Sequence, residues 1–228
     1  ITKKKFVNYW MHQDYVVVDD LAMSPRKGTL YTLDDIIEKG YDPLVLRHLF
    51  LKTHYRQKHN FTWQSMDESS KEINTIIRFL LWLDSKKKKI PLNNKIGLIQ
   101  QHYLDKIIEG LNDDFNTSES FKALSEFISE IYKKDDLFGE KDAQNIKKFI
   151  FEIDNIFGFI ESSYQKRVQE INTKIDCKII QKLLSDRNQF KIQKKYIEAD
   201  IIRDHFSSFG LQILDNSNGE SYVDLKSI

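Results

Sequence analysis

The sequence has little that would interrupt a helix or hold a metal. Among its 228 residues are three prolines, eight glycines and one cysteine, Cys177. Because proline and glycine are the residues that most disfavour helix interiors, their scarcity predicts a mainly helical chain. One cysteine excludes a disulfide framework and a cysteine-based zinc site built from this chain alone. No apolar run approaches the roughly 18 residues that a membrane span requires, so we expect no membrane segment.

An excess of charge of one sign is also lacking. The chain has 35 Lys and Arg against 34 Asp and Glu, a formal net charge of +1. This balance excludes a uniformly basic coat for nucleic acid, although a local basic patch remains compatible with it. Hydrophobic residues make up 40% of the chain, which excludes a disordered protein. The first residue, Ile1, is neither a translation start nor part of a signal peptide, so we expect the chain to belong to a longer polypeptide.

The order of patterns predicts a short β-containing start, a helical bundle and a small tail. Residues 6–18 are rich in aromatic and β-branched residues and are typical of strands. Later residues show helical periodicity with N-caps at Thr32 and Asp42, and the run Lys86–Lys89 is interpreted as a solvated break. Four helices are predicted for the bundle, over 62–85, 96–111, 117–131 and 146–157. Two more are predicted for the tail, over 174–186 and 188–209. The tail ends in a predicted β-hairpin, with strands at 211–215 and 221–225 around a turn at 216–219.

One loop stands out as a candidate site. Residues 23–29 combine two cations, a hydroxyl and a glycine in a segment whose Pro and Gly predict a turn. Lys and Arg on such a loop can neutralise charge that develops on a phosphate, and backbone donors near Gly28 can add hydrogen bonds. Composition alone favours an ordinary surface turn.

Other polar clusters allow two interpretations each. His54 and His59 are close in sequence, but no acidic or cysteine partner stands at metal-ligand spacing, which favours a polar junction between helices. A second cluster could form a basic surface on which Tyr196 stacks against a base, or it could be a solvated helix face. Its members are Arg187, Lys191, Lys194, Lys195, Tyr196 and Arg203.

Several stretches, in order along almost the whole chain, resemble cysteinyl-tRNA synthetases, which are class I aminoacyl-tRNA synthetases. Each stretch is weak evidence alone, but together they are specific. They are Phe6-Val7-Asn8-Tyr9-Trp10-Met11-His12, Leu33-Asp34-Asp35, Gly40-Tyr41-Asp42-Pro43, Leu46-Arg47-His48-Leu49, Thr53-His54-Tyr55-Arg56, Asn60-Phe61-Thr62, Asn112-Asp113-Asp114-Phe115-Asn116-Thr117, Glu198-Ala199-Asp200-Ile201-Ile202-Arg203-Asp204, and Gly210-Leu211 with Asp215 and Gly219.

The resemblance implies the C-terminal half of such an enzyme, which activates cysteine with ATP and Mg and attaches it to its tRNA. It implies a mainly α fold with a helical bundle of the anticodon-binding type. Residues 1–60 would form the end of the catalytic region, 61–172 the bundle, and 173–228 a small α/β tail that binds the anticodon. Family members are usually cytoplasmic monomers. Their nucleotide-binding His-Ile-Gly-His motif and their zinc ligands would lie upstream of Ile1, so we expect the 228-residue chain alone to be inactive.

The resemblance also assigns site residues and shows where this chain departs from the family. The ATP-binding signature loop would be Ala22, Met23, Ser24, Pro25, Arg26 and Lys27. The family loop reads Lys-Met-Ser-Lys-Ser, so Ala22 and Pro25 stand where lysines are usual, and Arg26 and Lys27 would substitute from shifted positions. The implied tRNA contacts are Lys191, Asp200, Arg203 and Asp215, with Lys191 in place of the usual Arg.

Two alternatives remain at this stage. The missing signature lysines would also fit a catalytically inactive tRNA-binding paralogue or module. A related family of ligases joins cysteine to a sugar amine without tRNA, but the recognisable tail through Asp215 and Gly219 argues against that assignment.

Overall fold

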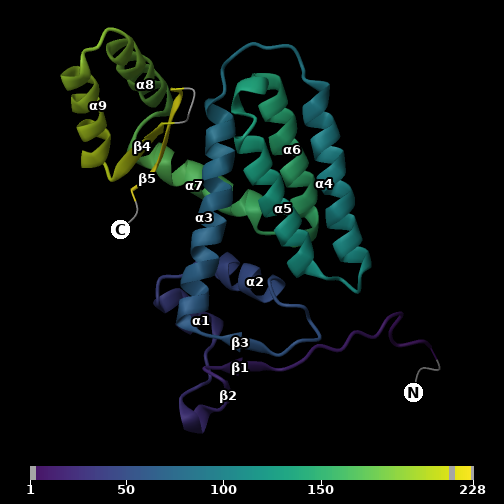
Figure 1. Ribbon diagram of the computed structural model, residues 1–228. Coiled ribbons are helices and arrows are strands. Elements are labelled where there is room, and N and C mark those ends of the chain that lie inside the picture. The colour runs from purple at the N-terminus through teal and green to yellow at the C-terminus, as the bar shows by residue number, and fades with distance from the viewer. Residues whose placement is uncertain (1–3, 216–218, 227–228) are drawn as a thin grey trace. The chain divides into compact units, whose positions relative to one another are not determined.

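The computed structural model describes residues 4–215 and 219–226. The chain is mainly helical with short β elements near both ends, which confirms the predicted fold class (Figure 1). It divides into two compact units. The first contains the described residues up to Ser70 together with 106–123, and the second contains 71–105 with the described residues from Leu124 onward. The three-part domain division stays a prediction. None of the described helices has the length and apolarity needed to cross a membrane.

A small sheet organises the first unit. Its strand order is β2 (Leu21–Ala22), β1 (Val16–Val18) and β3 (His59–Phe61), with β1 antiparallel to β2 and parallel to β3. The turn between β1 and β2 consists of Asp19 and Asp20, which have φ angles of 48° and 62°. Two consecutive left-handed residues form the turn type whose twist matches a hairpin, and aspartate tolerates that conformation better than most residues.

The helices of the first unit begin where the sequence predicts. The single turn η1 (Pro25–Lys27) precedes α1 (Leu33–Glu38) and α2 (Pro43–Leu51). Thr32 and Asp35 exchange side-chain and backbone hydrogen bonds as a capping box for α1, and the Asp42 carboxylate accepts from the backbone N–H of Leu44 at 2.9 Å. Both N-cap predictions are therefore confirmed.

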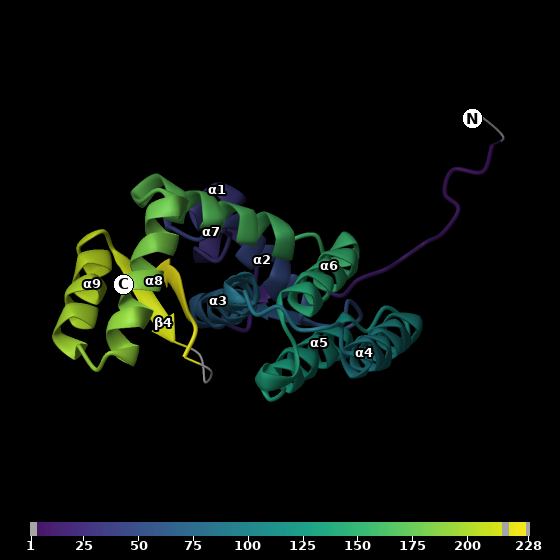
Figure 2. The same ribbon diagram turned by 90° about the horizontal axis from the view of Figure 1, so that it is seen from above.

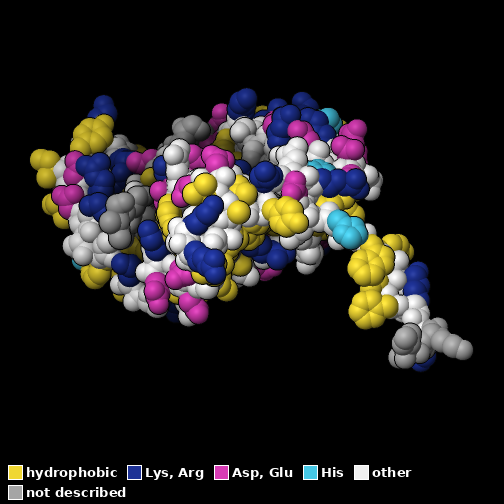
Figure 3. Space-filling view, turned by 90° about the horizontal axis from the view of Figure 1, so that it is seen from below, with side chains coloured by type: hydrophobic (Ala, Val, Ile, Leu, Met, Phe, Trp, Pro, Cys, Tyr) yellow, Lys and Arg dark blue, Asp and Glu magenta, His cyan; other side chains and the backbone are white. Residues whose placement is uncertain are grey.

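The strand predicted over residues 6–18 is wrong except at Val16–Val18. The residues before β1 have no regular secondary structure, and large side chains of this segment, including Phe6 and Trp10, are 91% and 72% exposed. Figure 3 shows hydrophobic side chains gathered along this segment. β-propensity describes how well a residue fits a pleated, half-buried surface, and the described residues offer this segment no such surface.

Three long helices continue from one unit into the other, and the second unit adds a fourth helix to them. They are α3 (Trp63–Ser85), α4 (Asn94–Asn112), α5 (Thr117–Tyr132) and, after the turn η2 (Asp135–Leu137), α6 (Glu140–Phe157). In the second unit the buried Phe79 and Trp82 pack against each other and against the more exposed Tyr132, with ring centroids 4.6–5.5 Å apart. Aromatic rings of this size dominate the burial of apolar surface in a helical core.

The helix α7 (Ile160–Lys174) has no counterpart among the predicted elements. Gly158 ends α6 with a φ of 69°, as the sequence predicts. The buried Asp154 carboxylate then accepts hydrogen bonds at 2.9–3.0 Å from the backbone N–H groups of Phe159, Ile160 and Glu161. A carboxylate from the preceding helix thus satisfies donors at the start of α7, and no local N-cap residue marks that start in the sequence.

The tail consists of two helices beside a hairpin. Helices α8 (Cys177–Ile192) and α9 (Tyr196–Ser208) lie side by side next to β4 (Leu211–Asp215) and β5 (Ser221–Leu225) (Figure 2). The antiparallel register from Leu211 opposite Leu225 to Asp215 opposite Ser221 confirms the predicted hairpin, while residues 216–218 of its predicted turn lie outside the described residues.

The boundary predicted between the two tail helices, at residues 186–188, is wrong. Helix α8 runs through it, and the break comes at residues 193–195. Lys194 has a φ of 59°, a left-handed conformation that ends the helix. No glycine or proline marks this break in the sequence, which is why the pattern did not locate it.

The interpretation of Lys86–Lys89 as a solvated break is wrong for its first residue. Lys86 is only 2% exposed, and its ammonium group pairs with Asp135 and, at 2.9 Å, with Glu220. The ammonium also lies 4.6 Å from the centre of the Trp82 ring. The other three lysines are exposed as predicted.

Candidate functional site

The basic loop is closed by its own hydrogen bonds. The Thr29 hydroxyl accepts from the backbone N–H of Ser24 and donates to the carbonyl of Ala22, both at 3.0 Å, and the Thr29 N–H donates to the Ser24 carbonyl at 3.2 Å. Gly28 takes a φ of 65°, which a residue with a β-carbon rarely adopts. Thr29 is only 8% exposed, so it is the anchor of the loop, a role that sequence reasoning did not assign to it. A threonine directly after the turn glycine is the signal that could have identified it.

The loop presents its cations to solvent. Arg26 and Lys27 are exposed within η1, and no carboxylate among the residues the structure describes forms an ion pair with either of them. Pro25 is the first residue of this turn, where its missing N–H costs no hydrogen bond. Ala22 ends β2, and Met23 is partly exposed beside it. The loop therefore offers two unpaired cations on a closed backbone turn, an arrangement that can meet a phosphate.

Two of the four predicted tRNA contacts lie together in the tail. The Asp215 carboxylate receives both terminal nitrogens of Arg187, at 2.8 and 3.1 Å, and the Lys191 ammonium at 2.8 Å. The Ser221 hydroxyl donates to the same carboxylate. Arg187 is 3% exposed, so neither of its two interpretations, a basic surface or a solvated helix face, fits it: Arg187 is buried as the partner of Asp215. No local pattern indicates this pairing, because the two residues are 28 positions apart in the chain.

The other two predicted contacts form a separate pair. Arg203 and Asp200 are three residues apart on α9, and their side chains pair at 2.6 Å with about half of each exposed. On the same helix, Tyr196 is 61% exposed. The structure thus divides the predicted tRNA contacts between a half-buried cluster around Asp215 and an exposed pair on α9.

The Asp215 cluster predicts how stability depends on pH. Burial alone would raise the pKa of the Asp215 carboxyl, but hydrogen bonds from Arg187, Lys191 and Ser221 outweigh that effect and hold this pKa well below its ordinary value. A depressed folded-state pKa contributes stability that is present above the unfolded pKa of about 3.9 and is lost as the pH falls below it. We expect Asp215→Asn to reduce the free energy of unfolding near neutral pH, and the difference from wild type to shrink between about pH 5 and pH 3.

Denaturant titrations of both proteins across this pH range measure that difference. Asp204→Asn, which removes an exposed carboxylate from α9, is the control and should leave the pH profile close to that of wild type. A wild-type advantage that stayed constant down to pH 3 would contradict the assigned electrostatic role of Asp215.

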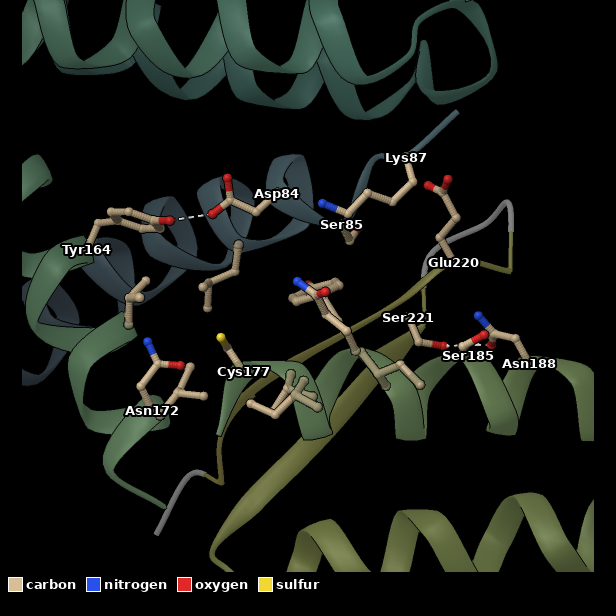
Figure 4. Close-up of a pocket in the computed structure, with 18 residues that line it drawn as sticks. Asp84, Ser85, Lys87, Tyr164, Asn172, Cys177, Ser185, Asn188, Glu220 and Ser221 are labelled. Atoms are coloured by element: carbon tan, nitrogen blue, oxygen red, sulfur yellow. Dashed lines mark hydrogen bonds between the residues drawn. The ribbon is translucent and has the colours of Figure 1, made fainter. Parts of the chain in front are cut away.

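A cavity of about 690 Å³ lies in the second unit beside the tail (Figure 4). Leu81, Ile171, Leu184 and other apolar side chains line it, and polar groups stand at its two ends. At one end the Tyr164 hydroxyl donates to Asp84, and at the other Ser221 Oγ lies 3.3 Å from Asn188 Oδ1. None of the four predicted tRNA contacts lines this cavity.

The two histidines considered as metal ligands have different surroundings. The His54 ring stacks on Tyr55, and its Nε2 lies 3.9 Å from the Asp114 carboxylate. His59 is on β3, where its Nδ1 is 2.8 Å from the Thr53 hydroxyl and burial lowers its pKa. Within residues 4–215 and 219–226, no group of three or more His, Cys, Asp or Glu could hold a metal ion.

Comparison with known proteins first identifies a class. Residues 1–71 match the family described as the catalytic domain of class I (C) tRNA synthetases. This range contains the small sheet, the basic loop and the start of α3. The class I signature-loop assignment of the sequence analysis therefore falls within the matched segment.

Longer stretches of the chain are similar to cysteine–tRNA ligases. The chain is 30% identical over 221 residues to cysteine–tRNA ligase of Protochlamydia amoebophila, 29% over 220 residues to that of Brachyspira hyodysenteriae and 31% over 240 residues to that of Treponema denticola. These alignments cover 95–96% of this chain but only 44–46% of the relatives, so the chain spans less than half of their length. The predicted resemblance to cysteinyl-tRNA synthetases is confirmed.

Proposed function

We propose that the chain is the C-terminal part of a cysteine–tRNA ligase, which activates cysteine with ATP and transfers it to its tRNA. The observation that supports this most strongly is the similarity of nearly the whole chain to cysteine–tRNA ligases. The proposal includes Mg as the companion of ATP, a zinc ion held by residues upstream of Ile1, and a cytoplasmic monomer. The names of the relatives favour the ligase over an inactive paralogue or module.

The basic loop supplies charge for adenylate formation in this proposal. When the cysteine carboxylate attacks the α-phosphate of ATP, negative charge builds on the departing pyrophosphate. Arg26 and Lys27 have exposed cationic groups without ion-pair partners among the described residues, and they can stabilise that charge. The hydrogen bonds of Thr29 hold the loop in its turn, so less ordering is needed when ATP binds.

Binding of tRNA is assigned to the tail. Arg203 and Tyr196 are exposed on α9 and can contact a phosphate and a base, and Lys191 lies at the edge of the Asp215 cluster. Asp200 and Asp215 pair with these cations, so they orient them, and their carboxylate oxygens can accept hydrogen bonds from base edges.

Cysteine-dependent ATP–pyrophosphate exchange tests the proposal. It is measured without tRNA on the full-length polypeptide to which the 228 residues are proposed to belong, called wild type below. We expect wild type to be active and Arg26→Ala/Lys27→Ala to lose about 10- to 100-fold in kcat, the scale expected when charge stabilisation in the transition state is removed. The control Lys88→Ala/Lys89→Ala removes two adjacent exposed lysines and should retain wild-type exchange.

The possible results separate the two parts of the proposal. No exchange by the wild-type protein, with intact tRNA binding, would refute the ligase and support the inactive module. Exchange that the loop variant leaves unchanged would refute the role of Arg26 and Lys27 while leaving the ligase assignment in place.

A further inference from the structure

Two of the stretches that resemble cysteinyl-tRNA synthetases lie in contact in the first unit, and neither belongs to the basic loop or the tail. The first contains Tyr55 and Arg56 in the segment after α2, and the second contains Asp114 between α4 and α5. One oxygen of the Asp114 carboxylate accepts from the Tyr55 hydroxyl at 2.6 Å and from Arg56 Nη2 at 3.2 Å. The other oxygen lies 2.7 Å from Arg56 Nε. The Asp114 carboxylate therefore binds both Tyr55 and Arg56, which precede it in the chain by 59 and 58 positions.

The Asp114 carboxylate fixes the direction of the Arg56 side chain. The guanidinium lies over the Tyr55 ring, 5.4 Å from its centre, and Nε also donates to the Tyr55 hydroxyl at 2.9 Å. Nevertheless the Arg56 side chain is 65% exposed, and its Nη1 has no hydrogen-bond partner among the residues described. An arginine that is held at two nitrogens while most of its side chain stays exposed can bind an anion through the third nitrogen.

The Phe115 side chain, next to Asp114, is exposed to solvent. Asp114 and Phe115 have φ angles of 53° and 54°, a left-handed conformation that aspartate tolerates but that is unfavourable for a bulky residue such as phenylalanine. Phe115 is 60% exposed, so burial of its ring does not compensate for the strain. Strained residues that persist in a structure are concentrated at functional sites, and an exposed ring suits stacking against a nucleobase.

The charge of the surrounding segment favours a polyanion. Between Asp42 and Asp67 the chain has no acidic residue, whereas it contains four Lys and Arg. These are Arg47, Lys52, Arg56 and Lys58. In a chain whose total charge is +1, this is a local concentration of positive charge, and such concentrations attract phosphate backbones.

We propose that Tyr55, Arg56, Asp114 and Phe115 form a second contact site for tRNA, distinct from the tail. Arg56 binds a backbone phosphate through Nη1, and the Phe115 ring stacks on an unpaired base. Asp114 is a positioning residue that holds Arg56 in place through its carboxylate. This inference rests on the proposed function, because the ligase supplies tRNA as the RNA partner.

Equilibrium binding of a cysteine tRNA transcript to the full natural chain, at several concentrations between about 50 and 200 mM salt, tests the site. We expect Arg56→Ala to weaken binding about tenfold and to reduce the salt slope by about 1, because one phosphate contact is lost. Phe115→Ala should weaken binding about five- to tenfold with an unchanged slope, because stacking releases no counterions. Asp114→Asn should weaken binding about threefold, since asparagine tolerates the left-handed backbone but holds Arg56 less firmly.

Matched controls separate these effects from general changes of charge. Asp113→Asn removes the neighbouring exposed carboxylate, and Lys122→Ala removes an exposed cation from α5 in the same unit. Both should bind within about twofold of wild type with the same slope. Thermal unfolding of every variant checks folding, and Arg56→Lys, which keeps the charge but not the planar fork, replaces Arg56→Ala if the latter does not fold.

Each result decides the matter. Wild-type affinity and slope for both Arg56→Ala and Phe115→Ala would overturn the site while leaving the ligase proposal intact. A lowered midpoint of thermal unfolding with unchanged tRNA binding would show that the Asp114 contacts are purely structural, and it would also overturn the site. Failure of the wild-type chain to bind tRNA would instead refute the proposed function.

Discussion

Replacing Asp224 with alanine is expected to lower the free energy of unfolding by about 3–5 kcal/mol. The Asp224 side chain is fully buried, and its two oxygens pair with Arg78 Nε at 3.0 Å and Arg167 Nη1 at 2.8 Å. Arg167 also donates to Asn74 at 2.7 Å. Removal of the carboxylate would take away the fully buried acceptor that Arg78 of α3 and Arg167 of α7 share, and breaking a buried ion pair by removing one partner is strongly destabilising.

Denaturant unfolding followed by circular dichroism measures this loss. The control Glu152→Ala removes an exposed carboxylate that pairs with Lys148 along α6, and it should cost no more than about 0.5 kcal/mol. Asp224→Asn keeps the shape and a hydrogen-bond acceptor, so its loss should be intermediate. If Asp224→Ala and Glu152→Ala cost the same, the buried network is not a main source of stability.

Replacing Lys86 with alanine is expected to cost a similar amount, about 3–5 kcal/mol, because Asp135 would remain buried without its cation. Asp135 is 6% exposed, and Lys86 itself is 2% exposed. The Lys86 ammonium also contacts Glu220 next to β5 and the ring of Trp82 on α3. Tryptophan fluorescence measures the unfolding: Trp82 is 1% exposed, so its contribution to the signal should change when this region unfolds.

The neighbouring residue provides the matched control. Lys87 is exposed, so Lys87→Ala should change the free energy of unfolding by less than about 0.5 kcal/mol. The double variant Lys86→Met/Asp135→Asn removes both charges, and it should cost less than the sum of its single changes. Equal losses for Lys86→Ala and Lys87→Ala would contradict the buried ion pair.

Most helices could be predicted from the sequence because their signals are local. The side chains of Thr32 and Asp42 cap helices by accepting from backbone N–H groups at most three residues further on. Gly158 ends α6 by its own left-handed backbone conformation. The hairpin was predictable for the same reason, since alternating strands flank a polar turn. Such features depend on the neighbouring sequence alone.

Some of the features that were missed depend on partners far away in the chain, and others on nearer residues that do not belong to a known cap or turn pattern. Arg187 and Lys86 look like surface cations in sequence, but Asp215 and Asp135, which are 28 and 49 residues further on, draw them into the interior. The start of α7 depends on a carboxylate inside the preceding helix. In the basic loop, the residue types were predictable, whereas the closure by Thr29 required the three-dimensional structure.

The position of β5 affects the order in which the protein can fold as it is made. Arg78 must wait for Asp224, 146 residues later, before its buried partner exists. At ribosomal rates of about 5–20 residues per second, that interval is roughly 7–30 s. Arg167 of α7 is made later and precedes Asp224 by 57 residues, so neither arginine has its Asp224 contact until β5 has been made. The strand β5 therefore acts as the closing element of this buried ion-pair network.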